Sequence, residues 1–239
     1  MNRIRQTAIL ATIGAVLAGW SVSSPAQIAK KGDGYLMRIK YTPGAHLKYS
    51  AQATFSTNAP NGNASPTTLN MPFSMLVKSF KNGVATIEFS ITPPSIGSGT
   101  PKPQTSTVQL DTLGRPVGGS AAPGVGTIGM PETPVKIGQT WTSKMPGMGG
   151  IMPGANVTAT YKLVGFKNVG GRNLAIVAVT MNLSGGESGM RASGNGTLQL
   201  RTEDGSLHAA DIKQSMTMTG RSGGSSIQAS TNIKVVRLQ

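Results

Sequence analysis

The chain has 239 residues, a formal charge of +14, no cysteine and only two histidines. The absence of cysteine excludes disulfides and thiolate metal sites, and the scarcity of histidines and acids leaves little for acid–base catalysis. Its 32 glycines and 15 prolines indicate many turns and loops rather than helices.

The first 26 residues have the features of a secretory signal peptide. Arg3 and Arg5 precede an uncharged, mostly apolar run at 7–19, which is shorter than the ~20 residues that a membrane span requires. Small residues then flank a cleavage site after Ala26. We therefore predict that residues 1–26 are removed on export, that no transmembrane span remains, and that the mature protein is periplasmic or extracellular.

Beyond this segment, apolar and polar residues alternate, which is the period of a half-buried strand. The first such stretch places Tyr35, Met37, Ile39 and Tyr41 on one face. We predict strands at 35–41, 46–55, 69–80, 84–92, 105–111, 115–118, 139–144, 155–166, 173–183, 191–201, 206–219 and 226–238. Tight turns such as Asn82-Gly83 alternate with longer segments, so we expect the long loops to leave one end of the sheet.

The second half of the chain repeats the first. Three stretches recur 86 or 90 residues later: 80–82 at 166–168, 84–89 at 174–179, and 108–110 at 198–200. Such self-similarity defines the unit of architecture. We therefore predict an all-β protein with two similar antiparallel β units, packed as a sandwich or as a split or half barrel. The predicted divisions of this one compact domain are a first unit at 27–117, a linker at 118–130 and a second unit at 131–239.

The second unit opens with Pro134-Val135-Lys136-Ile137-Gly138-Gln139-Thr140-Trp141. A large aromatic residue at a strand start is typical of a core position, although it can also stack on a ligand. This box, the glycine-turn hairpins and the exported β pattern resemble a family of uncharacterised bacterial secreted proteins, a domain of unknown function. The resemblance implies a bacterial periplasmic or surface setting and brings no catalytic residues.

Few residues are candidates for catalysis. His208 lies near Asp204 and Asp211, but an extended strand places His208 and Asp211 on opposite faces, about 10 Å apart. A hydrolase with a carboxylate pair, Glu88 with Asp111 or Asp211, is the alternative, and it requires two acids within about 10 Å. No phosphate-binding loop or dinucleotide fingerprint occurs. We predict a non-catalytic protein without a cofactor.

Positive charge is the first feature that favours binding. Lysine and arginine are spread over the whole predicted mature chain, whose formal charge is +12 once Arg3 and Arg5 are removed. Such a surface favours an anionic envelope component. Aromatic residues make up only 5% of the chain, which argues against nucleic acid as a partner.

The second feature is the methionine-rich segment 145–153. Thioethers fill irregular gaps, so this segment suits an apolar flap over the open end of a curved half-barrel, where an apolar small ligand would lie. Three methionines so close together are also weak candidates for a Cu(I) site: Met145, Met148 and Met152. The candidate ligand-binding residues are Trp141, Met145, Met148, Ile151 and Met152. We therefore predict an exported, non-catalytic β-rich protein that binds either an anionic envelope component or an apolar ligand.

Overall fold

The computed structural model describes residues 27–59, 62–63, 65–93, 101–118, 128–145, 155–185, 191–219 and 226–238. The predicted signal peptide lies outside these residues. The strands are β1 (Ile28–Lys31), β2 (Gly34–Met37), β3 (His46–Ala59), β4 (Gly62–Asn63), β5 (Thr67–Lys81), β6 (Val84–Ile91), β7 (Gln104–Asp111), β8 (Thr140–Met145), β9 (Ala155–Val169), β10 (Arg172–Gly185), β11 (Arg191–Arg201), β12 (Leu207–Thr219) and β13 (Ser226–Arg237).

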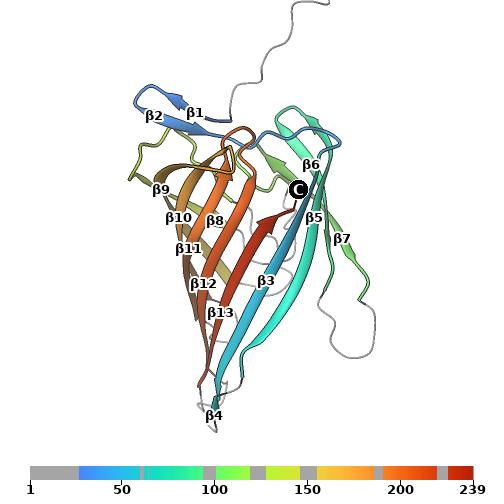
Figure 1. The fold of residues 1–239 in the computed structure, drawn as a ribbon, viewed down its shortest axis with the longest axis vertical. Helices are drawn as coiled ribbons and strands as arrows, with labels where there is room; N and C mark the ends of the chain where they lie inside the picture. The colour runs from blue at the N-terminus through green and yellow to red at the C-terminus, as the bar shows by residue number, and fades with distance from the viewer. Residues whose placement is uncertain are drawn as a thin grey trace, which may run out of the picture.

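One strongly curved antiparallel sheet makes up most of the fold (Figure 1). Its strand order is β7-β6-β5-β3-β13-β12-β11-β10-β9-β8, with β4 paired to β3, while β1 and β2 form a separate hairpin. The sheet is not closed into a barrel. The all-β prediction is confirmed, and the half-barrel is the arrangement observed. The last strand, β13, pairs with β3, so the two halves of the chain join edge to edge.

The hairpins β5–β6 and β9–β10 have the same register. In each, a β-bulge leaves one residue unpaired, Lys78 in β5 and Val164 in β9. The paired positions around the bulges correspond one to one: Val77–Ile87–Val108 and Leu163–Val177–Leu198. The recurring stretches of the sequence therefore occupy equivalent positions in the sheet. The divisions of the chain at 117 and 130 remain predictions.

Two predicted strands differ from those observed. The predicted strand 115–118 is only an isolated bridge between Leu110 and Pro116. The predicted strand 35–41 is paired only as far as Met37, because the backbone N–H groups that follow bond to three different parts of the chain. Those of Arg38, Ile39 and Lys40 donate to the carbonyl oxygens of Gln27, Thr112 and Asp204, at 2.9, 2.8 and 2.8 Å.

We call residues 38–41 the strap. It crosses the end of the sheet that carries the tight turns at 82–83 and 170–171 (Figure 1). Aromatic contacts lie on either side of it: Tyr35 of β2, three residues before the strap, lies against Phe166 with ring centroids 4.5 Å apart, and Tyr41 lies against Phe80 at 6.1 Å. Phe80 and Phe166 are the phenylalanines of the recurring Phe-Lys-Asn. Tyr35 of β2 and Tyr41 of the strap therefore contact equivalent positions of the two halves.

Two clusters of buried residues fill the concave face near the strap. One lies on β9–β12 and also includes Ile28, Met37, Leu113, Met130 and Val135; the other lies on β5–β7 and also includes Tyr41. Ile39 of the strap packs against both clusters. Each fully buried Val, Leu, Ile, Phe or Met side chain stabilises the fold by roughly 1.5–3 kcal/mol. The strap thus connects two buried clusters that pairing within the sheet leaves separate.

Substitution of Gly205 tests the strap. Gly205 has a φ of +69°, and a Cβ there would overlap the carbonyl oxygen of Arg38. Gly32 has a nearly equal φ of +65° with open space around it. Gly32→Ala should cost about 1 kcal/mol from backbone strain alone. Gly205→Ala should cost about 3 kcal/mol in urea unfolding, because overpacking adds to the strain. Equal losses in the two variants would show that the strap does not pack as described.

Candidate functional site

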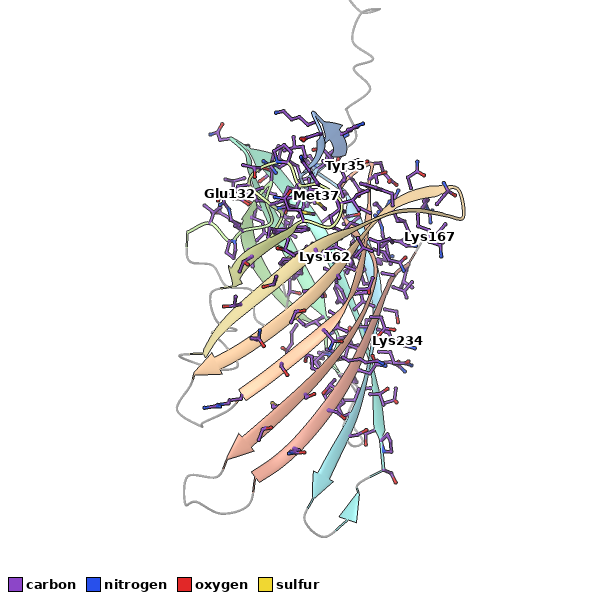
Figure 2. The ribbon with its side chains drawn as sticks, turned by 90° about the vertical axis from the view of Figure 1, so that its left-hand side faces the viewer. Tyr35, Met37, Glu132, Lys162, Lys167 and Lys234 are labelled. Atoms are coloured by element: carbon purple, nitrogen blue, oxygen red, sulfur yellow. The ribbon has the colours of Figure 1, made fainter. Side chains whose placement is uncertain are left out.

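Side chains on the concave face are buried at the strap end and more exposed to solvent farther from it. Alternation in the strands places one set of side chains on this face, and near the strap that set is almost fully buried. In Figure 2 the labelled Tyr35 and Met37 lie among the side chains gathered at that end. Farther along the same strands, large apolar side chains of this face are only partly covered, and Phe55 is 37% exposed.

These partly exposed side chains form what we call the open apolar surface. They belong to β3, β5, β12 and β13, face the same side as the buried clusters, and lie outside both of them. They are Phe55, Leu69, Met71, Phe73, Met216 and Ile233. Large apolar side chains left uncovered on one face typically mark a surface for a partner or ligand.

This face carries almost no charge. Among the inner-face positions of β3, β5 and β9–β13, only Arg237, at the strap end, is charged. Methionine recurs along the face, at Met71, Met75, Met181 and Met216. Its flexible thioether adapts to ligands of different shape. The face therefore suits an apolar group rather than an anion.

Trp141 is part of the core. Its indole N–H donates to the carbonyl oxygen of Gly129 at 2.8 Å, its ring stacks on Tyr161 with centroids 5.4 Å apart, and it packs against the buried cluster of β9–β12. Met145 is the last residue of β8, four residues along the same strand from Trp141. The other predicted ligand-binding residues, Met148, Ile151 and Met152, lie outside the described residues. The flap and the Cu(I) site therefore remain predictions.

The acidic side chains stabilise turns and form ion pairs. Six of those in the described part of the chain lie in salt bridges: Asp33, Glu88, Asp111, Glu132, Glu203 and Asp204. Asp111 also accepts hydrogen bonds from the backbone N–H groups of Leu113 and Arg115, both at 2.9 Å. Neither predicted carboxylate pair converges. Glu88 lies opposite Thr107, four residues or about 13 Å along the strand from Asp111, and Asp211 lies four strands away.

His46 lies in β3 and His208 in β12, so both histidines are in strands, as predicted. The sequence did not indicate that they share a pocket with four cations. His46 is exposed on β3, and His208 is half-buried on β12. Their proximity depends on the pairing of β13 with β3, which joins residues far apart in the chain. Within the described residues, no three His, Asp or Glu side chains gather closely enough to hold a metal ion.

Comparisons with known proteins yield only distant likenesses. No family model and no curated protein matches the chain. Lipovitellin, in a structure described by its lipid–protein interactions, is similar with 13% identity and a TM-score of 0.48; the match covers 84% of this chain and 26% of that one. A Parabacteroides distasonis protein, provisionally designated a lipoprotein, shows 10% identity and a TM-score of 0.36, with 83% and 97% of the two chains covered.

A third solved structure is a DUF1329 family protein from Desulfovibrio piger, with 12% identity, a TM-score of 0.18 and coverage of 79% and 83% of the two chains. These likenesses do not identify a family for the chain. The chain spans about a quarter of the lipovitellin chain. The described residues contain no helix with the length and apolar character needed to cross a membrane.

Replacing Trp141 distinguishes a core role from ligand stacking. Trp141→Phe keeps an aromatic ring on Tyr161 but leaves the Gly129 carbonyl without its donor. We expect a loss of about 1 kcal/mol in the free energy of unfolding and no change in the binding of an apolar ligand. Unchanged stability with altered ligand binding would assign Trp141 to the ligand site instead.

Proposed function

We propose that this protein is an exported, non-catalytic binding protein that holds an acyl chain, or a ligand of similar apolar chemistry, against the open apolar surface. One observation carries the proposal. The same face of one continuous sheet is packed at the strap end and carries partly exposed, uncharged side chains beyond it. Of the two ligand classes expected from the sequence, the concave face supports the apolar one.

The energetics favour a chain-like ligand. Side chains such as Leu69, Met71 and Phe73 follow one another at every second residue of β5. Apolar contacts therefore repeat about every 7 Å along the strand. Each methylene group that leaves water for such a surface contributes about 0.8 kcal/mol. A long acyl chain can therefore gain enough free energy to offset the entropy of its ordering.

The contacts of Gln27 and Ile28, the first residues after the predicted cleavage site, support export. The carbonyl oxygen of Gln27 accepts the N–H of Arg38, and Ile28 is buried in the core at 4% exposure. Cleavage after Ala26 would keep both of these interactions. Cleavage a few residues later would remove Ile28 from the core.

Binding of a fluorescent C16–C18 fatty acid tests the proposed function. Met71→Glu places a carboxylate on the concave face, while Asn70→Glu adds the same charge at the neighbouring position on the convex face. We expect saturable binding to the wild-type protein, a loss of at least tenfold in affinity for Met71→Glu, and a change within twofold for Asn70→Glu, because a charge desolvated by the chain is costly.

Phe55→Gln, on the exposed part of β3, serves as a second variant if Met71→Glu unfolds. It should weaken binding through lost apolar contact. The proposed function is wrong if the wild-type protein shows no saturable binding, or if Met71→Glu and Asn70→Glu bind equally well.

Maturation is a separate test. Expression of the full chain in a bacterial host should yield a periplasmic or secreted protein whose intact mass corresponds to a chain that begins at Gln27. A cytoplasmic protein that retains residues 1–26 would contradict export and leave the ligand proposal untouched.

A further inference from the structure

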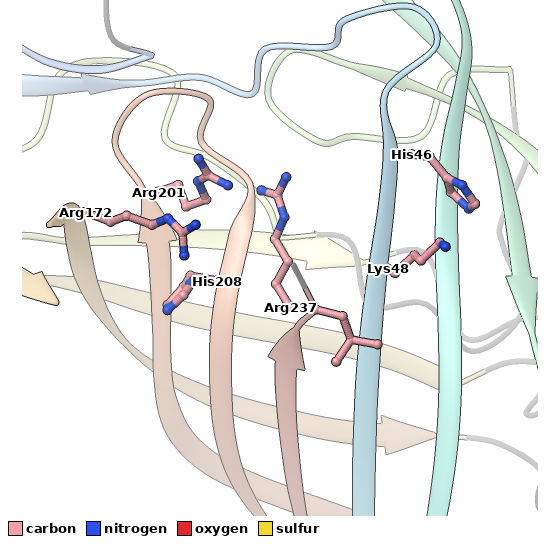
Figure 3. Close-up of a pocket in the computed structure, with 7 residues that line it drawn as sticks. His46, Lys48, Arg172, Arg201, His208 and Arg237 are labelled. Carbon is pink, nitrogen blue, oxygen red and sulfur yellow. The ribbon is translucent and has the colours of Figure 1, made fainter. Parts of the chain in front are cut away.

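Six basic side chains gather in one pocket at the strap end of the sheet. The pocket has a volume of about 490 Å³. Its basic residues come from five neighbouring strands: His46 and Lys48 of β3, Arg172 of β10, Arg201 of β11, His208 of β12 and Arg237 of β13. Figure 3 shows Arg172, Arg201, His208 and Arg237 grouped on adjacent strands, with His46 and Lys48 across from them.

This basic pocket is separate from the open apolar surface. His46 and Lys48 alternate with Leu47 and Tyr49, and Tyr49 faces the interior at 2% exposure. Arg201 likewise follows the buried Leu200. These three side chains therefore point to the convex side of the sheet, while Arg237, which is paired with Tyr49, reaches the pocket from an inner-face position at the strap end. A ligand in the pocket and an apolar ligand on the concave face occupy different surfaces.

Two of the arginines are held in place by acids of the turn between β11 and β12. Arg201 donates from Nε to Glu203 at 2.6 Å. Arg237 donates from Nη1 to the Ser206 hydroxyl at 2.8 Å and lies 3.5 Å from Asp204. The Asp204 carboxylate also accepts the backbone N–H and the hydroxyl of Ser206, at 2.9 and 2.6 Å. The turn thus fixes both guanidinium groups at the pocket.

The remaining cations of the pocket keep their charge uncompensated. Arg172 and Lys48 form no ion pair with any residue that the structure describes. Four cations of the pocket therefore face two acids, Glu203 and Asp204. Such an excess of positive charge in a partly enclosed site attracts an anion.

His208 responds to the same charges. Burial lowers the pKa of His208, and repulsion by Arg172, Arg201 and Arg237 lowers it further, while Glu203 opposes the shift. At neutral pH the imidazole is therefore neutral and can donate one hydrogen bond. An anion among these arginines would offset their repulsion and raise the pKa of His208.

We propose that the basic pocket binds a phosphate-type oxyanion, with Arg172, Arg201 and Arg237 as its main ligands and His208 and Lys48 as further donors. The planar guanidinium groups suit two-point hydrogen bonding to phosphate oxygens. The volume of the pocket leaves room for a group attached to the phosphate. Free phosphate and a phospholipid headgroup share this chemistry.

Calorimetric titration with inorganic phosphate at low ionic strength tests the site. Arg172→Gln removes a charge within the pocket, and Arg191→Gln removes the same charge from the far end of β11. We expect saturable binding by the wild-type protein, at least tenfold weaker binding by Arg172→Gln, and a change within twofold for Arg191→Gln. Lys48→Gln, at an exposed position, provides a second pocket variant with a smaller expected loss.

A proton NMR titration of His208 supplies an independent readout. Saturating phosphate should raise its pKa in the wild-type protein and have little effect in Arg172→Gln. The proposal is overturned if phosphate does not saturate the wild-type protein, or if Arg172→Gln and Arg191→Gln lose affinity equally, since that would indicate a merely basic surface.

Vesicles distinguish the two sources of the oxyanion. Retention on phosphatidic acid vesicles that Arg172→Gln abolishes, with no retention on phosphatidylcholine, would assign the site to a lipid headgroup. Phosphate binding without retention would assign it to a soluble phosphate. Because the pocket lies at the strap end and shares no residue with the open apolar surface, failure of phosphate binding would leave the fatty acid result unaffected.

Discussion

The strap across one end of the curved sheet is the constraint on which the rest of the structure depends. An open sheet has two unpaired edges, here β7 and β8, and nothing in the strand ladder alone fixes how far they approach. The backbone of Ile39 and Lys40 bonds to the turns after β7 and β11, and the side chain of Ile39 packs against both buried clusters. The strap thereby fixes the curvature of the sheet at the end that it crosses.

The two faces of the sheet acquire different chemistry from this arrangement. Where the strap closes the concave face, burial is nearly complete. Beyond it the same strands continue with apolar side chains and nothing from the strap to cover them. Charged side chains are confined almost entirely to the convex face, and at the strap end the turn of Glu203 and Asp204 pairs with arginines of two strands, Arg201 of β11 and Arg237 of β13. An apolar surface and a basic pocket therefore arise at different places on one sheet.

Local pattern predicted the strands well and their long-range pairing poorly. Period-two alternation indicated most of the strands, and the core role of Trp141 followed from its place after a glycine at a strand start. The choice between sandwich and half-barrel depended on whether β13 pairs with β3, which joins residues such as Val235 and Ala51. No local pattern contains that information, because the pairing is decided by which edges remain after both meanders form.

The basic pocket was beyond sequence reasoning for the same reason. Its residues extend from His46 to Leu238 and meet only because five strands are neighbours in the folded sheet. The strap was half predicted. The shared face of Tyr35, Met37, Ile39 and Tyr41 was evident from alternation, and its burial pattern follows it. That the segment bridges two halves instead of entering a sheet follows from the positions of the Thr112 and Asp204 carbonyls.

The central claim is that the concave face has a packed part at the strap end and an open part that binds an apolar ligand. Amide hydrogen exchange tests this most directly, with and without a saturating long-chain fatty acid. Amides of β6, β10 and β11 close to the strap should be the most protected and should not change on ligand addition. Amides around Met71, Met216 and Ile233 should exchange faster in the free protein and become protected when the ligand is bound. Uniform protection along the strands, or ligand protection confined to the strap end, would contradict the account.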